Sequence, residues 1–105
     1  MKVYIAGPMR GYPDLNRKEF NEAEKFLERK TIYYEIINPV RLDKESGLSD
    51  EELLTRKGLR QVMMRDLLEL SYCDVVYFLA GWEKSEGAKI EHALASMLNL
   101  TILYQ

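Results

Sequence analysis

Two kinds of hydrophobic pattern alternate along the chain. Runs of consecutive apolar, β-branched or aromatic residues are typical of strands, whereas apolar residues spaced three and four apart indicate helices. Strand-like runs occur at residues 3–6, 31–37, 75–79 and 101–104, and helical spacing occurs between them. The pattern therefore predicts the order strand, helix, strand, helix, strand, helix, strand.

Local signals bound the first helix. Asn16, with Glu19 three residues later, has the spacing of an N-terminal capping box, so the helix is expected to begin there. Apolar residues then recur at helical spacing until about Lys30. They are Phe20, Ala23 and Leu27.

Two further helices follow the second strand. The polar stretch 41–49 predicts a loop, and a helical segment that opens at Ser49 can be interrupted at Gly58. Beyond it, leucine, valine and methionine mark one face of a second long helix. Residues 81–87 predict a turn-rich loop, and residues 88–98 a third helix.

This alternation favours an α/β protein in which parallel strands are joined by right-handed crossovers. We expect a Rossmann-like or flavodoxin-like three-layer fold, with a mostly parallel sheet of four or five strands and helices on both faces. A chain of 105 residues forms one domain, residues 1–105. Ligands of such sheets bind at the carboxyl ends of the strands, which selects the loops 7–14, 80–87 and the segment from 38 onward.

Composition narrows the class of partner. A formal net charge of −2 disfavours a nucleic-acid polymer, which selects strongly basic surfaces, but permits a small nucleoside or nucleotide. The longest uncharged apolar run, residues 75–82, is too short for a bilayer, and the first strand begins without a signal peptide before it. A single cysteine, Cys73, fits a reducing compartment. We expect a cytoplasmic protein without a membrane partner.

Asp66 interrupts the apolar face of the second long helix. A carboxylate on such a face is costly unless it is paired or hydrogen-bonded. It is either a buried aspartate satisfied by backbone amides or an arginine, or a functional carboxylate with a perturbed pKa. The apolar residues of this face are Leu59, Val62, Met63, Leu67 and Leu70.

Glu91 stands at the border of the expected core stripe of the third helix. The helix is expected to begin near Ser85, so Glu91 lies within about two turns of its start, near the ligand edge of the sheet. Two carboxylates that converge on one pocket can divide nucleophile and acid–base roles, as in glycoside chemistry. The alternative is a solvated glutamate. The expected stripe consists of Ile90, Ala93, Leu94 and Met97.

Two loops at the ligand edge carry candidate binding residues. In the first, Gly7 and Gly11 would let the backbone approach a ligand, and Arg10 would hold a phosphate or ribose oxygen. The alternative is a tight turn with a solvated arginine. In the second loop, Ser85 adds a hydroxyl to an anion site at the helix start or simply caps the helix, and Trp82 stacks on a base or covers the core.

His92 and Cys73 do not suggest catalysis. Each occurs once, and neither has the spacing of a metal site or a Cys–His pair. Asp74, just before the third strand, is interpreted as structural. No metal or organic cofactor is expected, because the two carboxylates carry the chemistry.

The chain resembles the nucleoside 2-deoxyribosyltransferase superfamily, which includes 2′-deoxynucleoside 5′-phosphate N-hydrolases and small members of unknown function. The resemblance rests on motifs that follow one another in order along most of the chain. They are VYIAGPMRG at 3–11, DL at 66–67, CDVV at 73–76 and GAKIE at 87–91.

This resemblance implies a role for each matching residue. Glu91 aligns with the nucleophile that attacks the anomeric carbon, and Asp66 with the acidic residue that assists at the sugar and the leaving base. Tyr4 matches a tyrosine on the first strand that is expected to position the nucleophile or the sugar. Ser85 matches a phosphate-contacting serine of the N-hydrolases, where the transferases carry an aspartate. The resemblance implies substrate contacts at Gly7, Arg10, Gly11 and Ser85, whereas the loop at Trp82 departs from the family's usual sequence. The full set of candidate substrate contacts is Gly7, Met9, Arg10, Gly11, Trp82, Ser85 and Gly87.

The leading hypothesis is hydrolysis of the N-glycosidic bond of a (deoxy)nucleoside 5′-monophosphate. The alternatives are a non-catalytic nucleotide-binding module and a nucleoside deoxyribosyltransferase. Active members of the superfamily commonly complete the pocket from a neighbouring subunit, which implies a homo-oligomer. The apolar side chains of the second long helix, which extend to Met64 and Leu68, favour that helix as the interface of a homodimer.

Overall fold

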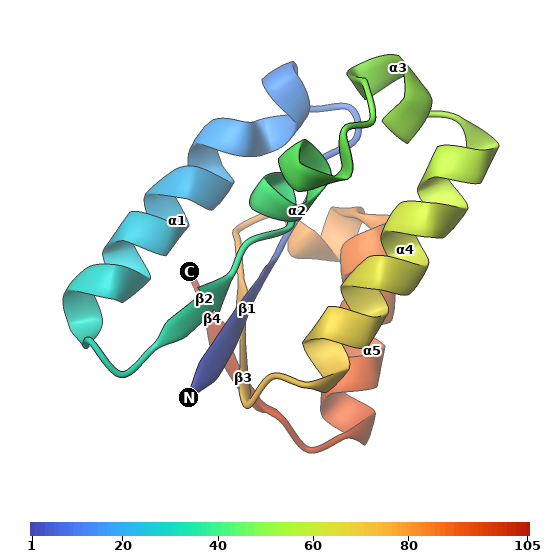
Figure 1. The fold of residues 1–105 in the computed structure, drawn as a ribbon. Helices are drawn as coiled ribbons and strands as arrows, with labels where there is room; N and C mark the ends of the chain where they lie inside the picture. The colour runs from blue at the N-terminus through green and yellow to red at the C-terminus, as the bar shows by residue number, and fades with distance from the viewer.

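A computed structural model describes all of residues 1–105 and confirms the α/β prediction. Four parallel strands form one sheet in the order β2-β1-β3-β4 (Figure 1). The strands are β1 (Lys2–Ala6), β2 (Glu35–Ile37), β3 (Val75–Phe78) and β4 (Thr101–Tyr104). The helices are α1 (Arg17–Lys30), α2 (Pro39–Ser46), α3 (Asp50–Leu53), α4 (Arg56–Ser71) and α5 (Glu86–Met97), with short 3-10 helices η1 (Pro13–Asn16) and η2 (Trp82–Lys84). No helix is long and apolar enough to cross a membrane.

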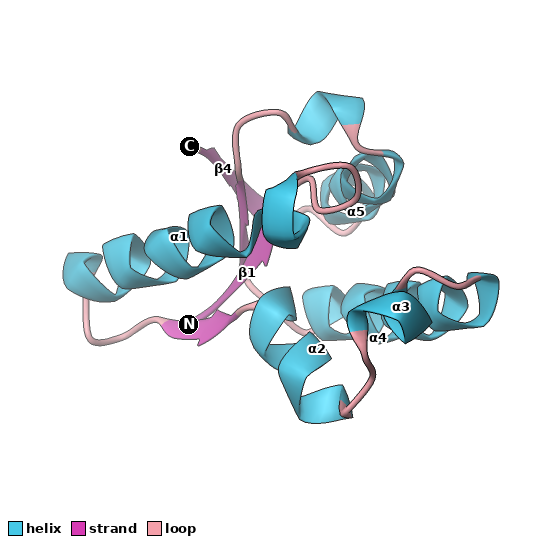
Figure 2. Ribbon diagram, turned by 90° about the horizontal axis from the view of Figure 1, so that it is seen from above, coloured by secondary structure: helices cyan, strands magenta, loops and turns pink.

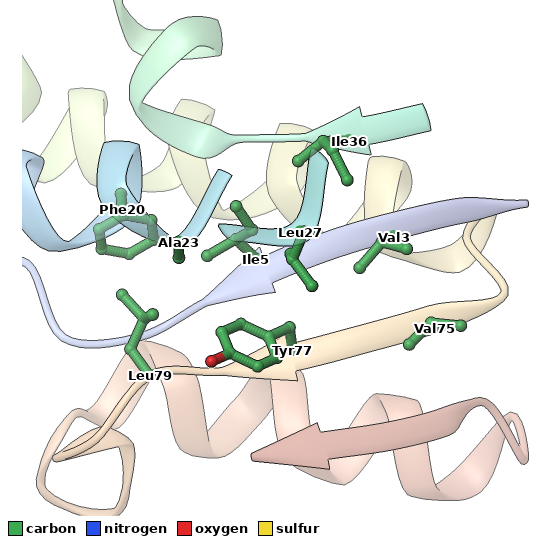
Figure 3. Packing of buried hydrophobic residues seen from close by; sticks show 9 residues of the cluster. All are labelled: Val3, Ile5, Phe20, Ala23, Leu27, Ile36, Val75, Tyr77 and Leu79. Carbon is green, nitrogen blue, oxygen red and sulfur yellow. The ribbon is translucent and has the colours of Figure 1, made fainter. Parts of the chain in front are cut away.

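Helices cover both faces of the sheet. Viewed from above, α1 lies on one side of the strands, and α4 and α5 lie on the other (Figure 2). Because successive strand residues point to opposite faces, each strand contributes to two cores. The core under α1 is drawn in Figure 3 and contains Val3, Ile5, Phe20, Ala23, Leu27, Ile36, Val75, Tyr77 and Leu79. The core under α4 and α5 contains Tyr4, Ala6, Leu70, Cys73, Val76, Phe78 and Ala95.

The second strand is shorter than the pattern predicts. It begins at Glu35, and the preceding residues form a turn in which Ile32 is 90% exposed. Strand propensity therefore did not decide the conformation of this segment, because no neighbouring surface is available to bury its side chains.

The predicted loop at 41–49 is also wrong, because most of it belongs to α2. The Asn38 side chain caps this helix by accepting the Val40 N–H at 3.0 Å, and Pro39 occupies its first position. Gly47 ends it with a φ of 75°. The Asn38-Pro39 pair, which directly follows β2, is therefore the start signal of a helix.

The predicted capping box at Asn16 does not form. Asn16 has a φ of 61°, and its side-chain amide donates to the Pro8 carbonyl at 2.8 Å instead of capping α1. Asp14 and Leu15 also have positive φ, so η1 is a left-handed turn that leads from β1 into α1. Tertiary contacts with the β1 loop therefore replace the local cap.

Gly58 does not interrupt the helical segment. The break lies at Leu54 and Thr55, and the Thr55 hydroxyl accepts the Gly58 N–H at 3.0 Å to start α4. Gly58 instead lets α4 approach α3, since a Cβ there would lie 1.9 Å from the Glu52 carbonyl oxygen. This contact holds α3 over the first turn of α4.

We predict that Gly58→Ala destabilises the fold by about 1–3 kcal/mol, because the added methyl group forces backbone atoms apart. Gly87→Ala is the matched control, because that glycine also lies in the first turn of a helix but its added Cβ would meet only Met63 Sδ at 3.5 Å. Urea unfolding of both variants measures the difference. Equal stabilities would contradict the tight α3–α4 contact.

Candidate functional site

Three buried polar side chains from three elements come together on the α4–α5 side of the sheet. Tyr4 lies on the central strand β1, paired in register with Ile37 of β2 and Val76 of β3. Asp66 comes from α4 and Glu91 from the second turn of α5. Asp66 raises the pKa of both Tyr4 and Glu91, so the three groups lie within electrostatic reach of one another. The structure thus brings together the three residues predicted as catalytic.

Glu91 is buried because α5 is rotated relative to the sequence prediction. Its sheet-facing residues are Ala88, Glu91 and Ala95, and the predicted core residues Ile90 and Met97 are 51% and 80% exposed. The expected core stripe is therefore wrong at these two positions and at Ala93, which is also exposed, and only Leu94 packs against the core. Small alanines let the helix lie close to the strands, and that closeness places the Glu91 carboxyl in the core.

Burial raises the pKa of Glu91 to about 8, since it disfavours the charged form. The negative charge of Asp66 acts in the same direction, and the hydroxyl of Tyr4 opposes it. Glu91 is 7% exposed and forms no ion pair, so the solvated-glutamate alternative does not describe it. With this pKa its carboxyl is protonated at neutral pH.

The Tyr4 hydroxyl is the one fully buried side-chain polar atom of the chain without a hydrogen bond. It lies near enough to Glu91 to lower the pKa of that carboxyl, although the two do not meet in hydrogen-bond geometry. Burial, followed by the charges of Glu91 and Asp66, raises the pKa of Tyr4. A buried unpaired hydroxyl costs about 1–3 kcal/mol, so this site carries a polar group that the fold itself does not satisfy.

Asp66 is held by its neighbour in sequence. Oδ1 of Asp66 accepts hydrogen bonds from Arg65 Nε at 2.9 Å and Nη2 at 2.7 Å, and the same Nη2 also donates to Asp43 on α2. Burial raises the pKa of Asp66 to about 6, although the positive charge of Arg65 lowers it. Asp66 was also interpreted as a buried aspartate that is satisfied by an arginine. Arg65 is that arginine, and it occupies one oxygen of the carboxylate.

The first ligand-edge loop is engaged mainly with the protein. Gly7 is required for packing, since a Cβ there would lie 2.8 Å from Cβ of Leu79. Met9 is half-buried against the core under α1, and Arg10 donates to the Leu53 carbonyl at 3.2 Å. Gly11 has a φ of 82° and open space around it. The structure does not bring Arg10 to the carboxyls as a free cation.

Ser85 and Trp82 of the second ligand-edge loop also make contacts within the protein. The Ser85 hydroxyl caps α5 by accepting the Ala88 N–H at 3.2 Å. Trp82 packs on Phe78 and stacks on the imidazole of His92 at 4.2 Å, so it covers the core under α5. His92 in turn hydrogen-bonds the Tyr104 hydroxyl. Asp74, interpreted as structural, accepts the Lys2 N–H at 2.9 Å.

Sequence reasoning missed Asp43 and Arg65. Asp43 was assigned to a loop, and its burial follows from the unforeseen helix α2. Arg65 had a signal, because it directly precedes the carboxylate that interrupts an apolar face. No three His, Cys, Asp or Glu side chains gather closely enough to hold a metal ion.

The fold of the chain is similar to that of a solved enzyme structure. The solved structure of a 2-deoxyribosyltransferase from Bacillus psychrosaccharolyticus matches 99% of this chain and 71% of its own, with a TM-score of 0.70 and 18% sequence identity. The nucleoside 2-deoxyribosyltransferase-like fold is thereby confirmed. The chain belongs to the family DUF4406, a domain of unknown function whose model matches residues 1–104. None of the curated proteins matches the sequence.

We predict that Glu91 makes the fold less stable as pH rises. Its pKa of about 8 in the folded state lies above the unfolded value of about 4.3, so the native state keeps a proton that the unfolded state releases. The contribution of the Glu91 proton to the free energy of unfolding is therefore full below about pH 4 and is lost as pH rises through 8. Relative to Glu91→Gln, the wild-type protein should lose up to about 1.4 kcal/mol per pH unit between pH 6 and 8.

Urea unfolding of both proteins across this range is the measurement. Glu86→Gln, a change of an exposed glutamate in the same helix, is the control and should follow the wild type. A constant difference between wild type and Glu91→Gln would show that the Glu91 carboxyl is solvated.

Proposed function

We propose that this protein cleaves the N-glycosidic bond of a deoxynucleoside, with Glu91 as nucleophile and Asp66 as acid–base group. The observation that carries the proposal is the convergence of two buried carboxyls with the unpaired hydroxyl of Tyr4 on one side of the central strand. Burying two carboxyls is costly. Enzymes that cleave glycosidic bonds usually use a pair of carboxyls whose pKa values differ.

The protonation of the pair fits this chemistry. With a pKa of about 8 for Glu91 and about 6 for Asp66, the two carboxyls hold one proton between them at neutral pH. Cleavage needs this count, namely one ionised nucleophile and one protonated acid. Because Glu91 has the higher pKa, the shared proton lies on Glu91, so bound substrate has to favour its transfer to Asp66.

The reaction then proceeds in two steps. The Glu91 carboxylate attacks the anomeric carbon, the bond to the base nitrogen breaks, and the departing base takes its proton from Asp66. The glycosyl ester on Glu91 is next attacked by an acceptor, which gives its proton to the Asp66 carboxylate. Tyr4 would hold the Glu91 carboxylate once it is ionised, because its hydroxyl is a free donor beside that group. The chemistry uses these side chains and requires no cofactor.

Two acceptors are candidates. Transfer to a second base is favoured by the structural neighbour, which is a deoxyribosyltransferase. Transfer to water, with a nucleoside 5′-monophosphate as substrate, is favoured by Ser85, which matches the serine of the N-hydrolases. Arg10 argues against phosphate binding, because its guanidinium already donates to the Leu53 carbonyl. Ser85 argues for it, because its hydroxyl accepts a hydrogen bond as the helix cap and still has a proton to donate. We therefore place nucleoside transfer first and nucleotide hydrolysis second.

We predict that the protein forms a new nucleoside from a deoxynucleoside and a second free base, with a rate that is highest between about pH 6 and 8 and falls on either side, because the reaction needs the singly protonated pair. Glu91→Gln should lower this rate at least about 10³-fold, because it removes the nucleophile. Glu86→Gln, in the same helix, is the matched control and should keep the wild-type rate. Chromatography of the reaction mixture is the measurement.

Parallel incubations with deoxynucleoside 5′-monophosphates distinguish the alternatives. Free base and sugar phosphate support hydrolysis, while tight calorimetric binding with the ligand recovered intact supports a non-catalytic nucleotide-binding module. Activity that survives in Glu91→Gln contradicts the proposed nucleophile.

We also propose a homodimer that pairs α4 with its symmetry mate and helps to close the site. Met64 and Leu68 on α4 are 69% and 57% exposed, and the adjacent α5 also exposes the apolar side chains of Ile90 and Met97. These two helices lie side by side in Figure 1. Exposed apolar groups that continue across two neighbouring helices are typical of an interface between subunits.

Light scattering should therefore give twice the monomer mass of 12.3 kDa. Leu68→Glu should yield a monomer, because a charge in an apolar interface is left without solvent. Ile32→Glu, a change of an apolar residue that is more exposed and remote from α4, should leave the dimer intact. A wild-type monomer that binds nucleosides normally would exclude both the interface and the shared site.

The compartment follows from the cysteine. Cys73 is buried and free, and a single cysteine cannot form a disulfide within the chain. We propose the cytoplasm, whose reducing conditions suit such a thiol.

A further inference from the structure

The guanidinium of Arg65 joins two buried aspartates that lie on different helices. Its Nη2 donates to Asp43 Oδ1 on α2 at 2.6 Å and to Asp66 Oδ1 on α4 at 2.7 Å. Asp43 and Asp66 are each 6% exposed. The three groups together carry one net negative charge, which is enclosed between the two helices.

The direction of the Arg65 side chain is unusual for its place in the sequence. Adjacent residues of a helix point about 100° apart and do not normally face one another. Arg65 nevertheless contacts Asp66 through two nitrogens, because the side chain bends toward α2, where Asp43 accepts its hydrogen bond. Asp43 is fixed in turn by the start of α2, where the buried Asn38 amide donates to Asn21 of α1 at 3.1 Å.

This arrangement uses only one oxygen of Asp66. Both bonds from Arg65 end on Oδ1, and Oδ2 accepts no hydrogen bond from the protein. We propose that Arg65 and Asp43 are positioning residues, which hold Oδ1 of Asp66 so that Oδ2 remains available for proton transfer to the leaving base beside Glu91. This inference rests on the proposed function, since it assigns the support of the acid–base group.

The charges around Asp66 predict two effects of opposite sign. Arg65 lowers the pKa of Asp66, whereas Asp43 on α2 and Glu69 on α4 raise it. Glu91 on α5 and Tyr4 on β1 complete the surroundings, and their own pKa values are raised by Asp66. Arg65→Gln should therefore raise the pKa of Asp66 above about 6, and Asp43→Asn should lower it.

The test is a carbon-13 NMR titration of the Asp66 carboxyl in the full chain without substrate. A merely structural role is distinguished by the sign, because loosening the fold would hydrate Asp66 and lower its pKa in both variants. Arg29→Gln, a change of an exposed arginine at the far end of α1, should leave the titration unchanged. A lowered or unchanged pKa in Arg65→Gln overturns the proposal.

Arg65→Lys serves if Arg65→Gln does not fold, because it keeps the charge but loses the fork that donates from Nε and Nη2. Its Asp66 pKa should lie between the values of wild type and Arg65→Gln, and a value below wild type overturns the proposal. In kinetics, Arg65→Lys should lower kcat about tenfold or more with little change in KM, and an unchanged kcat contradicts the positioning role. If the wild-type protein has no activity, the proposed function fails, whereas the titration still decides whether Arg65 and Asp43 control Asp66.

Discussion

Water is excluded from the Glu91 carboxyl because the alanine-containing face of α5, with Ala88 and Ala95, packs closely against the sheet. The cost of keeping a charge there governs the other features of the site. It raises the pKa of Glu91 to about 8, and it makes the nearby negative charge of Asp66 effective over the intervening distance. It also explains why the unpaired hydroxyl of Tyr4 matters, because this hydroxyl lowers the pKa of Glu91 and has no hydrogen-bond partner in the folded chain. A surface glutamate in the same position would have none of these properties.

The arrangement of the sheet explains why these groups meet. Tyr4 lies on a strand that has neighbours on both sides, and its side chain is fully buried in the core on the α4–α5 face. The helices α4 and α5 pack beside each other on the same face, and each contributes one carboxyl. A parallel sheet with crossover helices therefore brings together residues that are far apart in the sequence, which is how such folds build their sites.

The order of strands and helices followed from the hydrophobic pattern, because apolar period and turn residues are local properties. The errors arose where tertiary contacts decided the structure. Ile32 has strand propensity but no partner surface, and Asn16 bonds the Pro8 carbonyl rather than its own helix. The rotation of α5 differs from the prediction because the larger apolar residues Ile90 and Met97 face outward, whereas the small alanines Ala88 and Ala95 face the sheet.

The site was predictable in part for the same reason. Asp66 was recognisable as a carboxylate on an apolar face, and the resemblance to a known superfamily supplied Glu91 and Tyr4. Asp43 was not recognisable, because its burial depends on how α2 packs against α4, and no local pattern of the sequence encodes that contact. Arg10 shows the converse, since a cation beside a glycine looked like a ligand contact and instead bonds a backbone carbonyl.

The two alanines that flank Glu91 have a consequence for how this family can diverge. Ala88 and Ala95 are almost completely buried, so a larger side chain at either position has to lift α5 away from the strands. That movement would admit water to Glu91 and return its pKa to the ordinary value of a glutamate, while every residue proposed for the reaction stayed in place. Relatives could thus lose their chemistry by drift at chemically inert positions. The size of the side chains at positions 88 and 95 should be considered together with the carboxyls when activity is inferred for other members.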